Sequence, residues 1–139
     1  MDLDLRVVSA SERLDRIEFN PGSEWLAHAI QLGSYRCPHC GCLSELHTGT
    51  LRQHEHDRKH LDPSPWGQSC ARLRPLAAAW EWFLDFSCMG CGAPVRLFYG
   101  HGGEYSMGSH KYRLLEVVET ATWSKGDEAP WVSSQGRGV

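Results

Sequence analysis

The sequence lacks any long apolar run. No stretch approaches the roughly 20 consecutive apolar residues that a membrane-spanning helix needs. The first residues, Met1 to Arg6, also lack the basic start and apolar segment of a secretory signal. We therefore expect a cytoplasmic protein without a membrane partner, in a compartment where cysteines stay reduced.

The chain has no excess of positive charge and few signs of catalysis. It carries 14 Lys and Arg against 17 Asp and Glu, and its net charge of −3 argues against a general nucleic-acid binder. There is no Gly-x-Ser-x-Gly elbow and no phosphate-binding loop that ends in Lys-Ser/Thr. The segment His54-Glu55-His56 lacks the second histidine of the His-Glu-x-x-His pattern. We expect a protein that is not an enzyme.

The length of 139 residues suggests one domain. Apolar and polar residues alternate in several segments, with the period of half-buried strands. The expected strands are 2–8, 80–86, 95–99 and 111–119. In the second of these, Trp80, Trp82, Leu84 and Phe86 should share one face.

Two segments favour short helices, one over 24–32 after Ser23 and ending at Gly33, the other over 70–79, interrupted or started by Pro75. The predicted fold class is α+β, mostly antiparallel β with one or two short helices. We assign residues 1–123 to a single domain with a His-rich surface insertion at about 44–65. The Gly- and Ser-rich residues 124–139 are expected to form a flexible tail.

Two cysteine pairs carry the strongest chemical signal. Cys37-Pro38-His39-Cys40-Gly41 and Cys88-Met89-Gly90-Cys91-Gly92 each place two thiols two residues apart, followed by a glycine that suits a tight turn. A structural zinc ion requires four such ligands in a tetrahedron. In a reducing compartment this spacing favours a metal site over disulfides, so we predict that Cys37, Cys40, Cys88 and Cys91 bind one Zn²⁺. Iron is the alternative ion, because four thiolates suit it as well.

These pairs resemble the zinc knuckles of the zinc-ribbon superfamily, in which two knuckles sit at the tips of adjacent hairpins. The resemblance covers residues 34 to 99. It implies a zinc-ribbon-like site with four cysteine ligands and says little about activity. The gap between the pairs is longer than in simple ribbons, which implies an insertion or a larger fold.

The remaining cysteines and histidines favour simpler roles. Cys42 should pack beside the site, and Cys70 should be a small core residue. His54, His56 and His60 leave open a second metal site, but no carboxylate or cysteine completes that set at a usual spacing, so we favour a solvated loop. A further set of aromatic residues favours a hydrophobic core over a stacking platform for single-stranded nucleic acid. Its members are Trp80, Trp82, Phe83, Phe86, Phe98 and Tyr99.

The expected function is a non-catalytic zinc-binding module that binds another protein. In general character the small acidic chain also resembles bacterial immunity proteins, which bind and neutralise a cognate toxin or effector. That resemblance implies that acidic side chains face a basic cleft of the partner. The candidates are Asp85, Glu104, Glu116 and Glu119. The alternative is a zinc ribbon that binds nucleic acid in transcription or RNA handling, through a basic patch of Arg52, Arg58, Lys59, Arg72 and Arg74.

Overall fold

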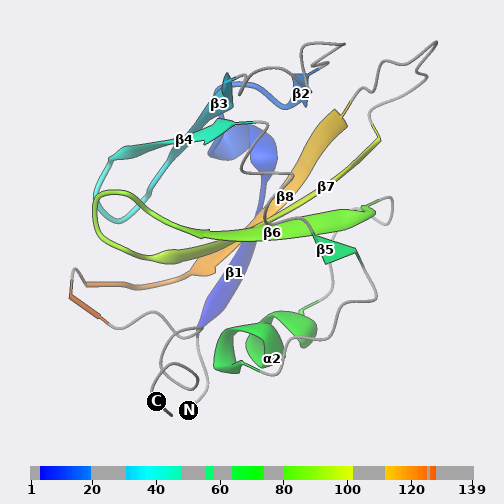
Figure 1. Ribbon diagram of the computed structural model, residues 1–139. Coiled ribbons are helices and arrows are strands. Elements are labelled where there is room, and N and C mark those ends of the chain that lie inside the picture. Colours follow the sequence, from blue (N-terminus) through cyan, green and yellow to red (C-terminus); the bar gives the residue numbers. More distant parts are fainter. Residues whose placement is uncertain are drawn as a thin grey trace, which may run out of the picture.

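The computed structural model describes residues 4–19, 31–47, 56–57, 64–73, 80–101, 112–124 and 126–127. Within these ranges it shows two antiparallel sheets, one α-helix and one 3₁₀ turn (Figure 1). The larger sheet has the order β1-β8-β7-β6-β5, with β2 also paired to β8, and the smaller sheet is the hairpin β3-β4. This confirms the predicted α+β class with a mostly antiparallel sheet.

The strands of the larger sheet come from the N-terminal, middle and C-terminal parts of the chain. They are β1 (Leu5–Ser9), β2 (Glu18–Phe19), β5 (His56–Asp57), β6 (Trp82–Ser87), β7 (Pro94–His101) and β8 (Tyr112–Thr120). The smaller sheet pairs β3 (Gln31–Arg36) with β4 (Leu43–His47). The two helical elements are the 3₁₀ turn η1 (Ala10–Glu12) and the helix α2 (Pro65–Ala71).

The larger sheet is covered on both faces. Successive strand residues point to opposite faces, so Val117 and Val118 of β8 belong to two different cores. On the Val117 side, Tyr35 and Leu46 of the β3-β4 hairpin pack against the sheet. On the Val118 side, the helix α2 packs through Trp66, as Figure 1 shows by the different sides that the hairpin and the helix occupy.

The aromatic residues of β6 and β7 mainly fill these cores, as predicted. Phe83, Phe98 and Tyr99 are buried. Trp80 is an exception to the predicted alternation, because β6 begins at Trp82 and Trp80 lies before it. Its ring therefore packs on the α2 side, with its centroid 4.7 Å from that of Phe98, and not on the face of Trp82 and Leu84.

The helix α2 begins earlier than predicted. Its N-cap is Ser64, whose hydroxyl accepts a hydrogen bond from the Gly67 amide at 3.0 Å, and Pro65 occupies the first turn. The helix ends at Ala71, so the prediction of a helix over 70–79 is wrong for residues 72 and 73, and 74–79 lie outside the described residues.

The prediction of a helix over 24–32 is wrong at its C-terminal end. Residues 20–30 lie outside the described ranges, but Gln31 and Leu32 belong to β3. Gly33, expected to stop a helix, lies at an irregularity of β3 with a φ of 153°. A Cβ atom there would lie 2.7 Å from Oδ1 of Asp15, so a side chain would displace the carboxylate that accepts the Ser34 amide.

The predicted insertion at 44–65 overlaps regular structure at its described positions. Ser44 and Leu46 of β4 are buried, His56 and Asp57 form β5, and Ser64 caps α2. Residues 48–55 and 58–63 lie outside the described residues, as do 125 and 128–139 of the predicted tail. The proposed domain boundaries stay predictions.

A buried carboxylate joins the hairpin to the larger sheet. Glu119 of β8 is only 1% exposed, and Tyr35 of β3 donates its hydroxyl to Oε2 of Glu119 at 2.6 Å. Arg13 donates from Nη2 to Oε1 at 2.7 Å, and Arg6 of β1 donates from Nε to the same oxygen at 2.9 Å. One side chain therefore connects β1, β3, β8 and the turn after η1.

The ionisation of Glu119 is set by this network. Burial alone would raise the pKa of Glu119, but the hydrogen bonds from Arg13 and Tyr35 and the charge of Arg13 outweigh it and hold the pKa below its usual value. Burial and the same carboxylate raise the pKa of the Tyr35 hydroxyl, which therefore stays protonated and donates. The carboxylate is charged in the folded protein at neutral pH.

We predict that Glu119→Gln lowers the free energy of unfolding by about 3–5 kcal/mol at pH 7, because it leaves a partly buried arginine without its counter-ion. Since the pKa of Glu119 is lowered by folding, its contribution is complete above the ordinary glutamate pKa of about 4.3 and is lost as the pH falls through the folded-state value. Urea unfolding of the unmodified protein and of the variant over a pH series measures the difference in the free energy of unfolding. The exposed Glu45→Gln is the control, and an equal effect of both changes at pH 7 would contradict the assignment.

Candidate metal centre

The two cysteine pairs fold into the same turn. In the first, between β3 and β4, the Cys37 amide donates to the Cys42 carbonyl at 3.0 Å and the Gly41 amide to the Cys37 carbonyl at 2.9 Å. In the second, between β6 and β7, the Cys88 and Gly92 amides make the corresponding bonds to Ala93 and Cys88, both at 2.9 Å. We call these turns the first knuckle (residues 37–42) and the second knuckle (residues 88–93).

The glycine after each pair is required by the backbone. Gly41 has a φ of 76° and Gly92 a φ of 80°, in the left-handed region that favours glycine. A non-glycine residue at either position would add strain although nothing lies within 4 Å of its Cβ position. The predicted turn is therefore present twice.

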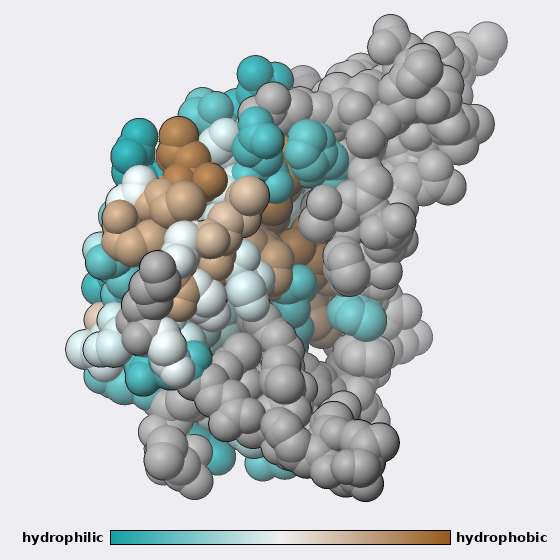
Figure 2. All heavy atoms as spheres, turned by 60° about the vertical axis from the view of Figure 1, so that its left-hand side comes forward, coloured by the Kyte–Doolittle hydropathy of each residue, from teal (hydrophilic) through white to brown (hydrophobic). Residues whose placement is uncertain are grey.

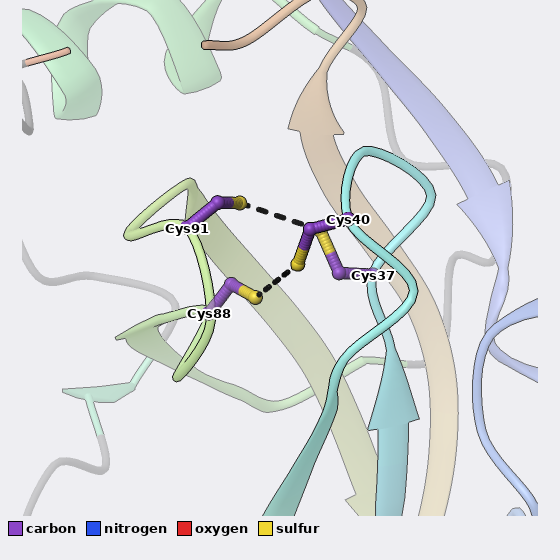
Figure 3. A group of neighbouring side chains, drawn as sticks. All are labelled: Cys37, Cys40, Cys88 and Cys91. Atoms are coloured by element: carbon purple, nitrogen blue, oxygen red, sulfur yellow. Dashed lines mark hydrogen bonds between the residues drawn. The ribbon is translucent and has the colours of Figure 1, made fainter. Parts of the chain in front are cut away.

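The knuckles bring their four thiols together, as Figure 3 shows. One ligand atom from each cysteine lies within 4.8 Å of all the others. Across the gap, the Sγ atoms of Cys37 and Cys91 are 3.7 Å apart and those of Cys40 and Cys88 are 3.5 Å apart. A tetrahedron with metal–sulfur bonds of about 2.3 Å has edges of about 3.8 Å, so the group can hold a metal ion. The prediction that Cys37, Cys40, Cys88 and Cys91 meet is confirmed.

Backbone amides point at the sulfurs within each knuckle. The His39 amide donates to Sγ of Cys37 and the Gly90 amide to Sγ of Cys88, both at 3.3 Å. Such bonds stabilise a thiolate over a thiol. All six cysteines are free thiols, so the described structure contains no disulfide in place of the site.

The three buried thiols, those of Cys37, Cys88 and Cys91, differ in how readily they ionise. Burial alone would raise the pKa of Cys88, but the amides of Cys91 and Gly90 outweigh it and lower the pKa to about 7. Burial raises the pKa of Cys37 and that of Cys91. A divalent cation that binds the cluster would displace the protons from its thiols, because thiolates are the metal ligands.

Contacts from outside the knuckles hold them in place. The His39 ring lies with Nε2 3.0 Å from the Thr120 carbonyl at the end of β8. The Trp123 indole donates to the Cys91 carbonyl at 3.0 Å, and the Met89 amide donates to the Ser44 hydroxyl at 2.9 Å. No local pattern signals these roles, because the partners are 81, 32 and 45 residues apart.

The centre has one exposed corner. Cys37, Cys88 and Cys91 are buried, whereas Cys40 is exposed. Cys42 lies beside the site but outside the group of four, and its thiol points to the Leu43 carbonyl at 3.6 Å. Cys70 is buried in the core beneath α2, as predicted.

The predicted acidic docking residues are differently placed. Glu119 is enclosed by the network above, and Glu116 is 4% exposed, with Oε1 lacking a hydrogen-bond partner in the described structure. Asp85 accepts two hydrogen bonds from Arg96, at 2.8 and 2.9 Å, and one from the Trp66 indole at 3.0 Å. Glu116 and Glu119 are both buried, so neither side chain is exposed to a partner in the described structure, and the assignment of a partner surface stays a prediction. Glu104 lies outside the described residues.

The described residues contain no second group of three or more potential metal ligands besides the four cysteines. His56 lies in β5 with its ring centroid 5.3 Å from that of Phe83. His54 and His60 lie outside the described part of the chain, as do Arg52, Arg58, Lys59 and Arg74 of the basic patch. Arg72 is exposed at the end of α2.

Comparison with protein-family models, curated proteins and solved structures finds no match to this chain. The geometry of the site therefore defines its class: two facing knuckles form a zinc-ribbon-like four-cysteine centre that can hold a metal ion. Among the described residues, no helix has the length and apolar character to cross a bilayer.

We predict that Cys37→Ser or Cys88→Ser removes several of the roughly 10 kcal/mol that a structural metal contributes, and lowers the melting temperature and the solubility. Cys70→Ser should cost only about 1–3 kcal/mol, since it puts a hydroxyl into an apolar core without touching the site. Thermal unfolding together with the metal content of each variant measures this. Equal losses for all three would contradict the ligand assignment.

Gly90 gives a second test of the geometry. A Cβ atom there would lie 2.7 Å from Cβ of Cys42 and 2.9 Å from Sγ of Cys40, so the two knuckles would have to separate. We predict that Gly90→Ala lowers metal affinity by about tenfold or more, the scale of a loss near 1.4 kcal/mol. Competition with a chelator measures the affinity. Met89→Ala is the control, because Met89 is 70% exposed, and an unchanged affinity in Gly90→Ala would contradict the close approach.

Proposed function

We propose that this protein is a non-catalytic module that uses one zinc ion to hold its fold and binds another protein. The observation that carries the proposal is the gathering of four sulfur ligands within 4.8 Å of one another, from two knuckles in different sheets. An ion at this point connects the β3-β4 hairpin to the β6-β7 hairpin. Its role is therefore architectural.

Zinc is the ion that we propose, with iron as the alternative that the donor set also allows. Zn²⁺ has no geometric preference of its own and takes the tetrahedron that four thiolates offer. The amide hydrogen bonds to Cys37 and Cys88 offset part of the negative charge that four thiolates place around one divalent ion. This compensation supports a stable four-thiolate site.

The donor set supports a role without catalysis. A zinc ion that activates water keeps one coordination position open, usually with three protein ligands. Four cysteines at these distances fill the tetrahedron. The absence of catalytic patterns in the sequence points in the same direction.

We favour a protein over nucleic acid as the partner, because several arginines of the described structure already bind carboxylates of the same chain. Arg6 and Arg13 both bind Glu119, and Arg96 binds Asp85, so these three guanidinium groups are paired with carboxylates within the fold. The net charge is −3. A toxin or effector stays the specific partner that the general character of the chain suggests, and its recognition would not involve the buried Glu116 and Glu119.

The test is the metal content of the protein purified without chelator. We expect about one zinc and no iron per chain, and a fall in melting temperature when a strong chelator removes the ion, because binding energy is folding energy in such sites. Elemental analysis and thermal unfolding of the same sample provide both readings. Iron at one equivalent, two ions per chain, or a metal-free protein of unchanged stability would contradict the proposal.

A further inference from the structure

The small sheet has one closed and one open edge. On the far side of β3, the Arg36 amide donates to the Arg13 carbonyl at 2.8 Å and the Asp15 amide donates to the Ser34 carbonyl at 3.3 Å. The residues after η1 therefore close that edge. β4 pairs with β3 alone, so its other edge has no strand partner among the described residues.

The pairing pattern shows which backbone groups face that open edge. The Cys37 amide donates to the Cys42 carbonyl, so backbone groups at Cys42 point toward β3. In an antiparallel ladder this direction alternates along the strand. The N–H and C=O groups of Leu43 and Glu45 therefore point outward, consistent with Arg36, paired to Leu43, pointing its amide to the opposite edge.

These outward N–H and C=O groups make almost no hydrogen bonds in the described structure. The Leu43 carbonyl accepts only a weak bond from the Cys42 thiol at 3.6 Å, which leaves one of its two lone pairs for an incoming amide. Native proteins commonly protect such an edge with proline, lysine or a bulge. β4 has a single charge there, that of Glu45.

Apolar surface adjoins the edge. The exposed large hydrophobic residues of the described structure are Leu43, at 48%, and Met89, at 70%. Leu43 is on β4, and the amide of Met89 is bound to Ser44 of the same strand. Figure 2 turns the knuckle ends of the hairpins forward and shows brown apolar surface gathered on that face. Leu43 thus places an exposed apolar side chain beside the outward backbone groups, on the same face of β4 as Glu45.

We propose that β4 is a docking edge at which an extended segment of a partner protein adds as an antiparallel strand. The segment would place a basic residue opposite Glu45 and an apolar residue against Leu43. This inference rests on the proposed function and names the surface through which it acts. Strand addition obtains affinity from main-chain hydrogen bonds and specificity from alternate side chains.

Charge favours a partner over a second copy of this chain. In a two-fold pairing of β4 centred on Glu45, the two Glu45 side chains would face each other across a spacing of about 5.5 Å. Like charges directly opposite each other destabilise a strand pair, whereas an opposite charge stabilises it. The net charge of −3 acts in the same sense.

The test uses the zinc-loaded full-length protein and a phage-displayed library of random linear peptides. We expect the selected peptides to be rich in β-branched and basic residues and to slow amide exchange at Leu43 and Glu45. Glu45→Pro should weaken their binding by about tenfold or more, because it removes an outward amide but no bond to β3. The control Glu45→Gln keeps that amide and should lose only a few-fold.

A charge-reversed variant gives an independent reading should Glu45→Pro fail to fold. Glu45→Lys keeps the amide, and should weaken the basic peptides while binding peptides with an acidic residue at the opposing position. The docking edge would be overturned if Glu45→Pro and Glu45→Gln bound the peptides equally well, or if the peptides protected amides other than those of Leu43 and Glu45. Selection of no peptide, or a dimer of this chain that Glu45→Lys dissolves, would also overturn it. If the sample still contains one zinc per chain, the proposed module stands, whereas a sample without zinc refutes the module itself.

Discussion

The structure depends on four sulfur atoms that must occupy one small volume. The cysteine pairs in contact across the gap are 54 and 48 residues apart in sequence, and they belong to hairpins of different sheets. Four thiolates so close would repel one another without a cation between them. A metal ion bound at this point would turn a repulsive contact into a link between the two sheets, and its binding energy would then contribute to folding.

Besides the four-cysteine centre, a hydrogen-bond network around Glu119 attaches the β3-β4 hairpin to the larger sheet. The knuckle fixes one end of β3, while Tyr35, in the same strand, donates to the buried Glu119 that also binds Arg6 and Arg13. Tyr35 and Leu46 pack in the same apolar core as Cys37, Cys88 and Cys91. With β3 held in this way and its far edge closed, β4 is the strand of the small sheet that has an unpaired edge among the described residues.

The sequence predicted what is local and missed what is long-range. The knuckles were recognisable because spacing and glycine act within five residues, and the strands because alternation reports a half-buried sheet. Charge predicted exposure for Glu116 and Glu119, but the partners that bury Glu119 lie 84 to 113 residues away. The Ser64-Pro65 helix start is a local signal, but it lies within a polar stretch that was predicted to be a surface insertion. The face of Trp80 was predicted wrongly because the strand begins two residues later, at Trp82, than the alternating pattern does.

X-ray absorption at the zinc edge of the purified protein tests the central claim most directly, because it reports the type, number and distance of the atoms bound to the ion. The account predicts four sulfur ligands at about 2.3 Å and no nitrogen or oxygen ligand. A first coordination shell that contains nitrogen or oxygen, or fewer than four sulfurs, would contradict it.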